Sequence, residues 1–463
     1  MRDRLSTEQL AKFKRGHDVG ILAQKLFPGG VDLSPESPLK YDKAIQQTAK
    51  HIKKKTPVIF EAAFQYNGVL AALDILVFKE NGWYAYEVKS SLSISHTFLL
   101  DASLQYYVIR NSGVELKEFN IIYVNESYVK NDNLELSLLF NIENVTTQVR
   151  NNEEFVNSKV EIFKKVVSGY KEPDIDIGEH CDIPYTCDYK GYCWNKIPAK
   201  GSVFSLDKLS KKERFELYKY SLVKINSIPD SYPLSNEVRF QINLYKKKKI
   251  WNDDLKFAQF ISRVKYPVCI IHIAVNNPAI PLFPGNRPYQ QLPFAAGILY
   301  QKSENDKPKY SYFIDEPIND PTFHCLEFLT EHSTGSKSII VFSDIKEWSC
   351  FDCIHTISDK KEILNNIKEK TINLYEPFTN LYHYNPKIGF DYKIENIIKS
   401  ISENGLSRTI IKNDTELSDA YAQLRTDTDI FRISEIKANI EDYIKVATDY
   451  DYQILKYLES KLE

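Results

Sequence analysis

The chain has 463 residues, a formal net charge of −2 at pH 7 and 43% hydrophobic residues. This length predicts two or three domains, and the hydrophobic content is ample for packed cores. The balanced charge excludes a basic field over the whole surface, so binding to a polyanion would need local patches. The lysine runs at residues 53–55 and 246–249 are candidates for such patches, with solvated surface as the alternative for each.

The opening residues Met1–Arg4 lack the apolar core of a signal peptide, and the longest apolar stretches are too short to span a bilayer. The seven cysteines are few for this length and odd in number, which argues against a disulfide framework. We therefore expect a soluble, cytoplasmic protein without a membrane partner.

Residues 1–55 are predicted to be mainly helical, with Ser6 placed to open the first helix. Beyond them, two apolar, β-branched and aromatic runs flank Asn81-Gly82. Asn-Gly predicts a hairpin with a type I′ turn, because both central residues of that turn need positive φ. With these two residues as the loop, Glu80 pairs with Trp83 and the pairing continues outward.

Three charged residues share one face of this predicted hairpin. Asp74 is expected opposite Lys89, with Glu87 one diagonal step from Asp74. Their neighbours are apolar, so these charges are costly unless they are paired or bound to a metal. Two carboxylates on adjacent strands can hold Mg²⁺ or Mn²⁺, which polarises a phosphate and acidifies a water, while Lys89 stabilises the developing charge. The alternative is a structural salt bridge inside a hairpin.

A helix is predicted over residues 98–110, because Leu100, Leu104 and Val108 recur at helical spacing. Asp101 and Gln105 are four residues apart and share another face of this helix. Residues 115–170 are predicted to contain one more strand, Phe119–Val124, and then a charged helical stretch.

The order Glu61, Asp74, Glu87-Val88-Lys89 and Gln105 resembles the RecB-like branch of the PD-(D/E)XK nucleases. That branch includes CRISPR-associated exonucleases with an iron–sulfur cluster. The resemblance implies a restriction-endonuclease-like α/β domain over residues 1–199. It also implies that Asp74, Glu87 and the Val88 carbonyl bind metal with help from Glu61. Lys89 would be catalytic, and Gln105 would contact the substrate or orient the site.

The segment FKRGHDVGILAQKLFPGG resembles the N-terminal helix of the same nucleases. Many relatives carry a histidine four residues after the helix glycine, and the position four residues after Gly16 is Gly20 in this chain. His17, which follows Gly16 directly, is therefore a candidate metal-site residue, with a surface or capping role as the alternative.

Residues 178–194 read GEHCDIPYTCDYKGYCW and carry Cys181, Cys187 and Cys193, with His180 beside the first. Such a cluster in a cysteine-poor chain indicates a metal site, and thiolates suit zinc or an iron–sulfur cluster. The trio resembles that of the iron–sulfur relatives, which usually supply a fourth cysteine near the N-terminus. This chain has no cysteine before Cys181. The alternatives are a 4Fe–4S cluster with a non-cysteine ligand, a zinc site completed by His180, and a lost site.

Residues 200–262 are predicted to form a helical connector, broken near Pro229 and Pro233. Residues 263–463 alternate strand and helix patterns, which predicts a second α/β domain. Its expected strands are YPVCIIHIAV, a hairpin of ILYQK with YSYFID, and SIIVFS; its expected helices are Phe323–Glu331, Lys361–Leu374 and Glu441–Leu458.

The proline-rich segment NPAIPLFPGNRPYQQLPF resembles one in a large group of uncharacterised bacterial proteins. They join a RecB-like nuclease half to a half resembling DnaQ-type 3′–5′ exonucleases, which implies an RNase H-like fold here. The Asp-x-Glu of those exonucleases corresponds to His272 and Ala274, and a later aspartate corresponds to Asn373. Asp449 corresponds to the last acid. We therefore expect a catalytically degenerate second domain.

The expected function is a Mg²⁺- or Mn²⁺-dependent DNA nuclease, acting in DNA repair or in antiviral defence against foreign DNA. Its expected partners are DNA and, through the C-terminal half, another protein. The alternatives are a non-catalytic nucleic-acid-binding or scaffolding protein and an RNA-directed nuclease. A different alignment of the second half would make Asp315 or Asp344 the real acids of a second nuclease.

Overall fold

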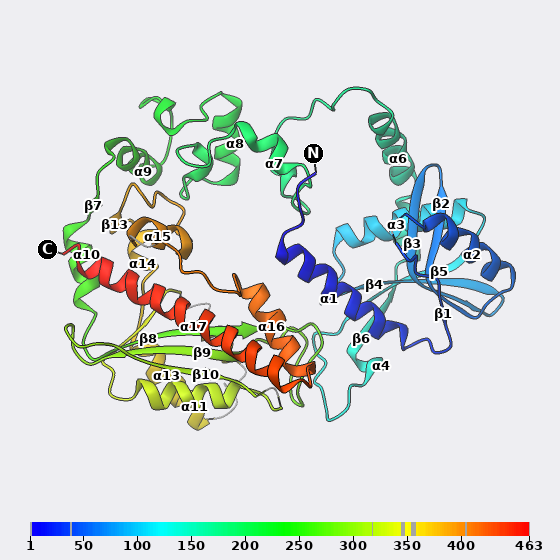
Figure 1. Cartoon of the computed structure of the whole chain (residues 1–463). Helices are drawn as coiled ribbons and strands as arrows, with labels where there is room; N and C mark the ends of the chain where they lie inside the picture. Colours follow the sequence, from blue (N-terminus) through cyan, green and yellow to red (C-terminus); the bar gives the residue numbers. More distant parts are fainter. Residues whose placement is uncertain are drawn as a thin grey trace. The chain divides into compact units, whose positions relative to one another are not determined.

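The computed structural model describes residues 2–37, 39–316, 318–343, 348–352, 358–402 and 405–462, with side chains in the fifth range from residue 360 onward. The fold is mixed α/β and forms two compact units, each built from more than one stretch of sequence (Figure 1). The carboxylate unit comprises Leu5–Ile175 and Pro278–Gln290; the second unit comprises Met1–Arg4, Asp176–Asn277 and Gln291–Glu463. Within the described ranges no helix is both long enough and apolar enough to cross a membrane.

The carboxylate unit is built on a six-stranded sheet in which spatial order follows chain order. Its strands are β1 (Val31–Asp32), β2 (Val58–Tyr66), β3 (Val69–Lys79), β4 (Gly82–Lys89), β5 (Leu116–Val124) and β6 (Phe140–Asn144). β2, β3 and β4 form an antiparallel meander, whereas β5 runs parallel to β4. The parallel pair needs a crossover, which α3 (His96–Asn111) supplies. The predicted helix over 98–110 and the predicted strand Phe119–Val124 are confirmed, whereas the prediction of a single strand within 115–170 is wrong, because β6 pairs with β5.

Helices pack on both faces of this sheet. α1 (Thr7–Gln24) contacts β3 and β4, and the Ser6 hydroxyl caps it by accepting a hydrogen bond from the Gln9 amide, as predicted. α3 contacts β2, β3 and β5, and α5 (Thr146–Asn151) and α6 (Glu153–Val167) pack against α3. α2 (Tyr41–Lys53) packs on β2, and α4 (Leu136–Leu139) directly precedes β6. The core therefore has two apolar layers with the sheet between them.

The β3–β4 hairpin is present, but its turn lies one residue earlier than predicted. Lys79 pairs with Gly82, so the two loop residues are Glu80 and Asn81, with φ of 50° and 56°. Both values lie in the left-handed region that a type I′ turn requires. Gly82 belongs to the strand, where a Cβ would lie 2.3 Å from Cγ of Lys117. A larger residue at this strand position would therefore collide with the Lys117 side chain.

This shift moves the register by two residues. Ile75 pairs with Tyr86, so the next position outward sets Asp74 opposite Glu87, and the predicted pairings of Asp74 with Lys89 and of Glu80 with Trp83 are wrong. A two-residue shift keeps each side chain on its face, because successive side chains alternate. Asp74 and Glu87 are therefore directly opposite each other and lie closer together than in the predicted diagonal arrangement.

The second unit is built on a five-stranded sheet in the order β10-β9-β8-β11-β12. Its strands are β8 (Val268–Asn276), β9 (Leu292–Gln301), β10 (Lys309–Ile314), β11 (Ser338–Val341) and β12 (Thr371–Asn373). β8, β9 and β10 are antiparallel, whereas β11 runs parallel to both β8 and β12. The predicted strands and the predicted hairpin of this half are confirmed. A separate two-stranded ribbon pairs β7 (Trp251–Asn252) with β13 (His383–Tyr384).

Helices cover both faces of the second sheet (Figure 1). α11 (Thr322–Ser333) and α13 (Ser358–Glu369) pack on one face, and α16 (Asp414–Thr426) and α17 (Ile430–Glu459) pack on the other. The predicted helices Phe323–Glu331 and Glu441–Leu458 lie within α11 and α17. The predicted helix Lys361–Leu374 is wrong at its end, because residues 371–373 form β12 and pair with β11. Pairing with a buried strand outweighs the local helical pattern.

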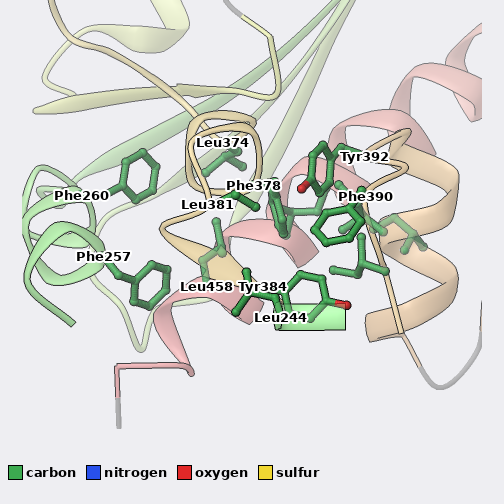
Figure 2. Close-up of a cluster of buried hydrophobic side chains, with 14 of the residues drawn as sticks. Leu244, Phe257, Phe260, Leu374, Phe378, Leu381, Tyr384, Phe390, Tyr392 and Leu458 are labelled. Carbon is green, nitrogen blue, oxygen red and sulfur yellow. The ribbon is translucent and has the colours of Figure 1, made fainter. Parts of the chain in front are cut away.

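Residues 200–262 are helical, as predicted, and they pack into the main core of the second unit. The helices are α8 (Lys211–Lys219), α9 (Asn236–Lys247) and α10 (Asp254–Ser262), with α14 (Glu376–Thr379) and α15 (Ile394–Ile401) beside them. Figure 2 shows side chains of this core, including Leu244 from α9, Phe257 from α10 and Leu458 from α17. The Cys-rich segment, which contains α7 (Lys190–Cys193), also belongs to this unit.

Candidate functional site

Three carboxylates form one row across the carboxylate unit. Glu61 lies opposite Asp74 in the register of β2 and β3, and Asp74 lies opposite Glu87 at the position after the last pair of β3 and β4. Side chains that face each other on adjacent strands have Cβ atoms about 5 Å apart. Three strands therefore bring three acids together, although they are spread over residues 61–87 of the sequence.

The backbone changes face where this row crosses β2. Val58 and Phe60 pack with the apolar layer of α1, whereas Ala62 and Phe64 pack with the layer of α3. All four are even-numbered, so regular alternation would put them on one face. Glu61 lies between the two pairs with φ of 53°, a left-handed conformation that costs a non-glycine residue roughly 1–3 kcal/mol. Strain of this kind is typical of functional sites.

The neighbouring strand β3 changes face at the same level. Residues 75 and 77 pack with the layer of α1, whereas residues 71 and 73 pack with the layer of α3. Asp74 lies at the change. Regular alternation along β3 is therefore interrupted at Asp74. The paired distortions at Glu61 and Asp74 coincide with the row of acids.

The acids open into a cavity of about 660 Å³. It is lined by α1 residues, including His17, and by strand residues of the carboxylate row, together with Ser90 and Phe98. The predicted residues in its lining are His17, Glu61, Asp74, Glu87, Val88 and Lys89. The sequence-based candidates from β2, β3 and β4 thus line one cavity, together with His17 from α1.

Lys89 is held between two carboxylates. Its Nζ donates to Oε1 of Glu87 at 2.8 Å and to Oδ2 of Asp101 at 2.6 Å, and it lies 5.5 Å from the ring centroid of Phe98. Burial acts to lower the pKa of Lys89, but the charges of Glu87 and Asp101 outweigh it and raise that pKa. The ammonium is therefore charged at neutral pH and fixed at the cavity wall.

The acids of the row carry raised pKa values. Burial raises the pKa of Glu61 to about 7, with further contributions from the charges of Asp32 and Glu87. Burial also raises the pKa of Asp74, although the Val88 amide, which donates to its Oδ2 at 2.6 Å, acts to lower it. The pKa of Glu87 is raised by burial and by the charge of Asp74. The positive charge near the three carboxylates therefore does not balance their negative charge.

The chemistry of these donors fits a hard divalent cation. Oε2 of Glu87 is buried, and no group in the described part of the chain hydrogen-bonds to it. Carboxylate and carbonyl oxygens are the ligands that Mg²⁺ prefers, and a cation would relieve the repulsion within the row. As the side chains lie, the described ranges contain no group of three His, Cys, Asp or Glu residues that could hold one metal ion. The pair Asp74 and Glu87, with the Val88 carbonyl, is therefore the donor set to consider.

Gln105 does not line the cavity, although it lies on α3 one turn after Asp101. Its side chain is 7% exposed, and its buried Oε1 has no hydrogen-bond partner among the described residues. Asp32 and Ser34, which sequence reasoning missed, do line the cavity. The side chain of Asp32 accepts from both the amide and the hydroxyl of Ser34 at 2.8 and 2.7 Å. β1 has two residues, too few for a periodic signal.

The proline-rich segment 278–290 packs onto the carboxylate unit. It is a compact loop, closed by a hydrogen bond of 2.8 Å from the Tyr289 amide to the Pro278 carbonyl. Ala279 is buried with the layer of α1, and Asn286 is 2% exposed. The Tyr289 hydroxyl donates to the backbone carbonyl of Ser90, which lines the cavity. This loop therefore supports the cavity wall.

In the structure the side chains of the three cysteines are not positioned as ligands of one metal ion. Cys181 is buried beside Phe215, whereas Cys187 and Cys193 are exposed. The Cys187 amide donates to the Cys181 carbonyl at 2.8 Å, so the backbone brings these two residues together. His180 directly precedes Cys181, and no set of three potential ligands in the described residues could hold a metal here. The cysteine site stays a prediction.

The N-terminal residues lie against this Cys-rich segment. The Asp3 amide donates to the Asp188 carbonyl at 2.6 Å, and the Gly191 amide donates to Oδ2 of Asp3 at 2.7 Å. The resemblance described above places a fourth cysteine near the N-terminus of the iron–sulfur relatives. In this chain the Asp3 carboxylate contacts the Cys-rich segment through the Gly191 amide.

The second unit replaces the expected acids with other side chains. His272 and Ala274 lie on β8, and the face that carries them turns toward α17. Nδ1 of His272 lies 3.6 Å from Oδ2 of Asp451, which is fully buried. Asp449, the expected last acid, accepts from Gln453 on its own helix at 2.6 Å. The carboxylate beside His272 is therefore that of Asp451.

Asn373 and Asp315, two further candidate residues of this unit, have structural partners. Oδ1 of Asn373 accepts from the Tyr375 amide at 2.8 Å. Oδ2 of Asp315 accepts from the Tyr421 hydroxyl at 2.9 Å, and burial raises the pKa of Asp315 to about 6. Asp344 lies outside the described residues.

Part of the chain matches a known protein family model. No curated protein matches the chain. Residues 275–391 match a family model described as a domain of unknown function, DUF2779. The matched range begins at the end of β8, contains the proline-rich segment and extends through β13. This part of the chain is therefore similar to that family of unknown function.

Proposed function

We propose that the carboxylate unit is a divalent-metal-dependent nuclease of the RecB-like PD-(D/E)XK type, which hydrolyses phosphodiester bonds in DNA. One observation carries the proposal: Glu61, Asp74 and Glu87 form a row across three adjacent strands, with Lys89 two residues after the last acid. The antiparallel meander followed by the β4–α3–β5 parallel crossover supports the same assignment. DNA repair and defence against foreign DNA are the pathways that fit this activity.

Asp74, Glu87 and the Val88 carbonyl would hold the metal, with Glu61 beside them. A bound Mg²⁺ or Mn²⁺ would polarise a phosphate and acidify a water. The role of Lys89 follows from its own contacts. Glu87 and Asp101 hold its ammonium in place and keep it charged, so it can stabilise the negative charge that develops on the phosphate.

We further propose that the second unit has an RNase H-like fold without exonuclease activity. The sheet order β10-β9-β8-β11-β12, with three antiparallel strands followed by two parallel ones, supports this fold. The central strand carries His272 and Ala274 where a two-metal site would need carboxylates. A role in binding nucleic acid or a partner protein is what such a unit retains.

The test uses the full chain with labelled single-stranded DNA, double-stranded DNA and RNA, each with Mg²⁺, Mn²⁺ or chelator. We expect metal-dependent cleavage of DNA. Asp74→Asn, Glu87→Gln and Lys89→Met should each reduce the rate by at least about 10²-fold, the usual effect of removing an electrostatic contribution to catalysis. Glu80→Gln and Lys79→Met change the same charges on the same hairpin and should retain full activity.

Two results would overturn the nuclease assignment: no cleavage of any substrate with either metal, or full activity of the Lys89→Met variant. Cleavage of RNA in preference to DNA would favour the RNA-directed alternative. Circular dichroism and thermal unfolding of each variant establish that a lost activity does not reflect a lost fold.

A further inference from the structure

A second cavity, of about 670 Å³, lies in the second unit near the C-terminal end of α17. Four lysines line it: Lys248 at the end of α9, Lys387 after β13, and Lys456 and Lys461 at the end of α17. They come from three separate segments, so the fold gathers them into one place. The chain carries a net charge of −2, and this concentration of lysines is therefore a local feature.

The positive charge of this cavity is only partly neutralised. Lys456 pairs with Glu459 at 2.8 Å. Among the described residues, no carboxylate forms an ion pair with Lys248, Lys387 or Lys461. Burial lowers the pKa of His383 behind the cavity to about 4, and the charge of Lys461 acts in the same direction. The cavity is thus an anion-attracting environment.

Tyrosine rings and polar groups complete the cavity wall. Tyr452 and Tyr457 line it, with Nζ of Lys456 at 5.8 Å and Nζ of Lys461 at 5.2 Å from their respective ring centroids. The Tyr457 hydroxyl accepts from Nδ2 of Asn385 at 2.7 Å and lies 2.9 Å from Nε2 of His383. These contacts fix the Tyr457 side chain before any ligand arrives.

We propose that this cavity binds the phosphodiester backbone of single-stranded nucleic acid. Lysines that attract phosphates, beside aromatic rings on which bases stack, are the combination that single-strand-binding grooves use. Lysines from three segments can contact successive phosphates of one strand. A single phosphate would need the lysines of only one segment. The site lies in the second unit, and binding there does not require the carboxylate unit to be catalytic.

The test measures binding of the full chain to short labelled oligo(dT) by fluorescence anisotropy in chelator, where metal-dependent cleavage cannot occur. The triple variant Lys248→Ser, Lys387→Ser, Lys461→Ser should bind at least tenfold more weakly. The slope of log Kd against log salt concentration should be smaller by about 2 in this variant, because each single-strand phosphate contact contributes about 0.7 to that slope.

The matched control removes three lysines from the region of α13, which packs on the opposite face of the sheet from α17. The variant Lys361→Ser, Lys368→Ser, Lys370→Ser has the same charge change and should bind within about twofold of the unmodified chain. Tyr452→Leu keeps the charge, so it should weaken binding several-fold without changing the salt slope, as loss of base stacking predicts.

Equal weakening in the two triple variants would overturn the proposal, because it would assign binding to overall charge. Displacement of oligo(dT) by micromolar AMP or inorganic phosphate would show a small-ligand site and would overturn the strand assignment. Loss of binding with intact metal-dependent cleavage, or the reverse, separates this proposal from the proposed nuclease activity.

Discussion

The side-chain hydroxyl of Tyr289 donates a hydrogen bond to the backbone carbonyl of Ser90, across 199 positions of sequence. Ser90 follows Lys89 directly and lines the cavity of the carboxylate row. The guanidinium of Arg15, from α1, lies 5.7 Å from the centroid of the Tyr289 ring. Tyr289 thus joins the proline-rich segment, α1 and the end of β4 at one point of the cavity wall.

We expect Tyr289→Phe to lower the cleavage rate because it removes the hydrogen bond that holds the backbone next to Lys89. A hydrogen bond of this kind contributes about 1 kcal/mol to stability, so the melting temperature should fall by a few degrees at most. A positioning role predicts a several-fold decrease in kcat with little change in KM. Steady-state kinetics and thermal unfolding measure both quantities.

Tyr170→Phe is the matched control. This substitution also removes one tyrosine hydroxyl, but from a side chain that is fully exposed. It should leave kcat and the melting temperature unchanged. If Tyr289→Phe has unchanged kcat, the contact with Ser90 does not position the site.

Local sequence patterns were sufficient to predict most of the strands and helices. The apolar runs around Asn81-Gly82 predicted the hairpin, and the spacing of Leu100, Leu104 and Val108 predicted α3. Local turn propensity alone predicts the wrong register, because it favours Asn81-Gly82 as the two loop residues. The close approach of Lys117 to Gly82 joins neighbouring strands that are far apart in the sequence.

The candidate site was only partly predictable for a similar reason. The predicted hairpin and the alternation of side chains along its strands were enough to predict that Asp74, Glu87 and Lys89 share one face. The left-handed backbone at Glu61 and the supporting contact from Tyr289 arise from packing between distant segments. Such contacts leave no periodic pattern in the sequence. Asp32 was missed because its strand is too short to show one.

The charge of Glu61 should make the metal-free protein less stable as pH rises. The pKa of Glu61 is raised from 4.5 to about 7, so between these values the folded state binds more protons than the unfolded state. The free energy of unfolding therefore falls as pH increases through this window. Glu61→Gln cannot ionise and avoids this loss. We expect its melting temperature to exceed that of the unmodified chain by more at about pH 8 than at about pH 5.

Thermal unfolding in chelator measures this difference, and Glu80→Gln, on the exposed turn of the hairpin, is the control. Addition of Mn²⁺ at about pH 8 should raise the melting temperature of the unmodified chain more than that of Asp74→Asn, because a bound cation stabilises the folded state. A difference between Glu61→Gln and the unmodified chain that is the same at both pH values would contradict the prediction.

The cysteine trio should bind one metal centre if the sequence-based interpretation holds. We expect stoichiometric iron or zinc after anaerobic purification, and a visible absorption spectrum distinguishes a 4Fe–4S cluster from zinc. Cys181→Ser, Cys187→Ser and Cys193→Ser should each lower the metal content and the melting temperature. Asp3→Asn tests whether the carboxylate that contacts this segment also matters for metal content.

Cys269→Ser is the control, since this cysteine is buried in β8, away from the trio in sequence, and should keep the full metal content. Absence of both iron and zinc, with unchanged stability of all three serine variants of the trio, would mean that the site is vestigial.

The second unit should show no exonuclease activity in the full chain. A two-metal site needs several carboxylates, and β8 supplies His272 and Ala274 where two of them would lie. Nδ1 of His272 lies 3.6 Å from Oδ2 of the fully buried Asp451. A full chain that carries both Asp74→Asn and Glu87→Gln has no other proposed catalytic site. It should therefore leave the 3′ ends of labelled single strands intact in Mn²⁺ over a time in which the unmodified chain cleaves the same strands. Trimming from the 3′ end by this double variant, lost on adding Asp315→Asn or Asp344→Asn, would show that the chain carries two nucleases and that the acids of the second unit were assigned wrongly.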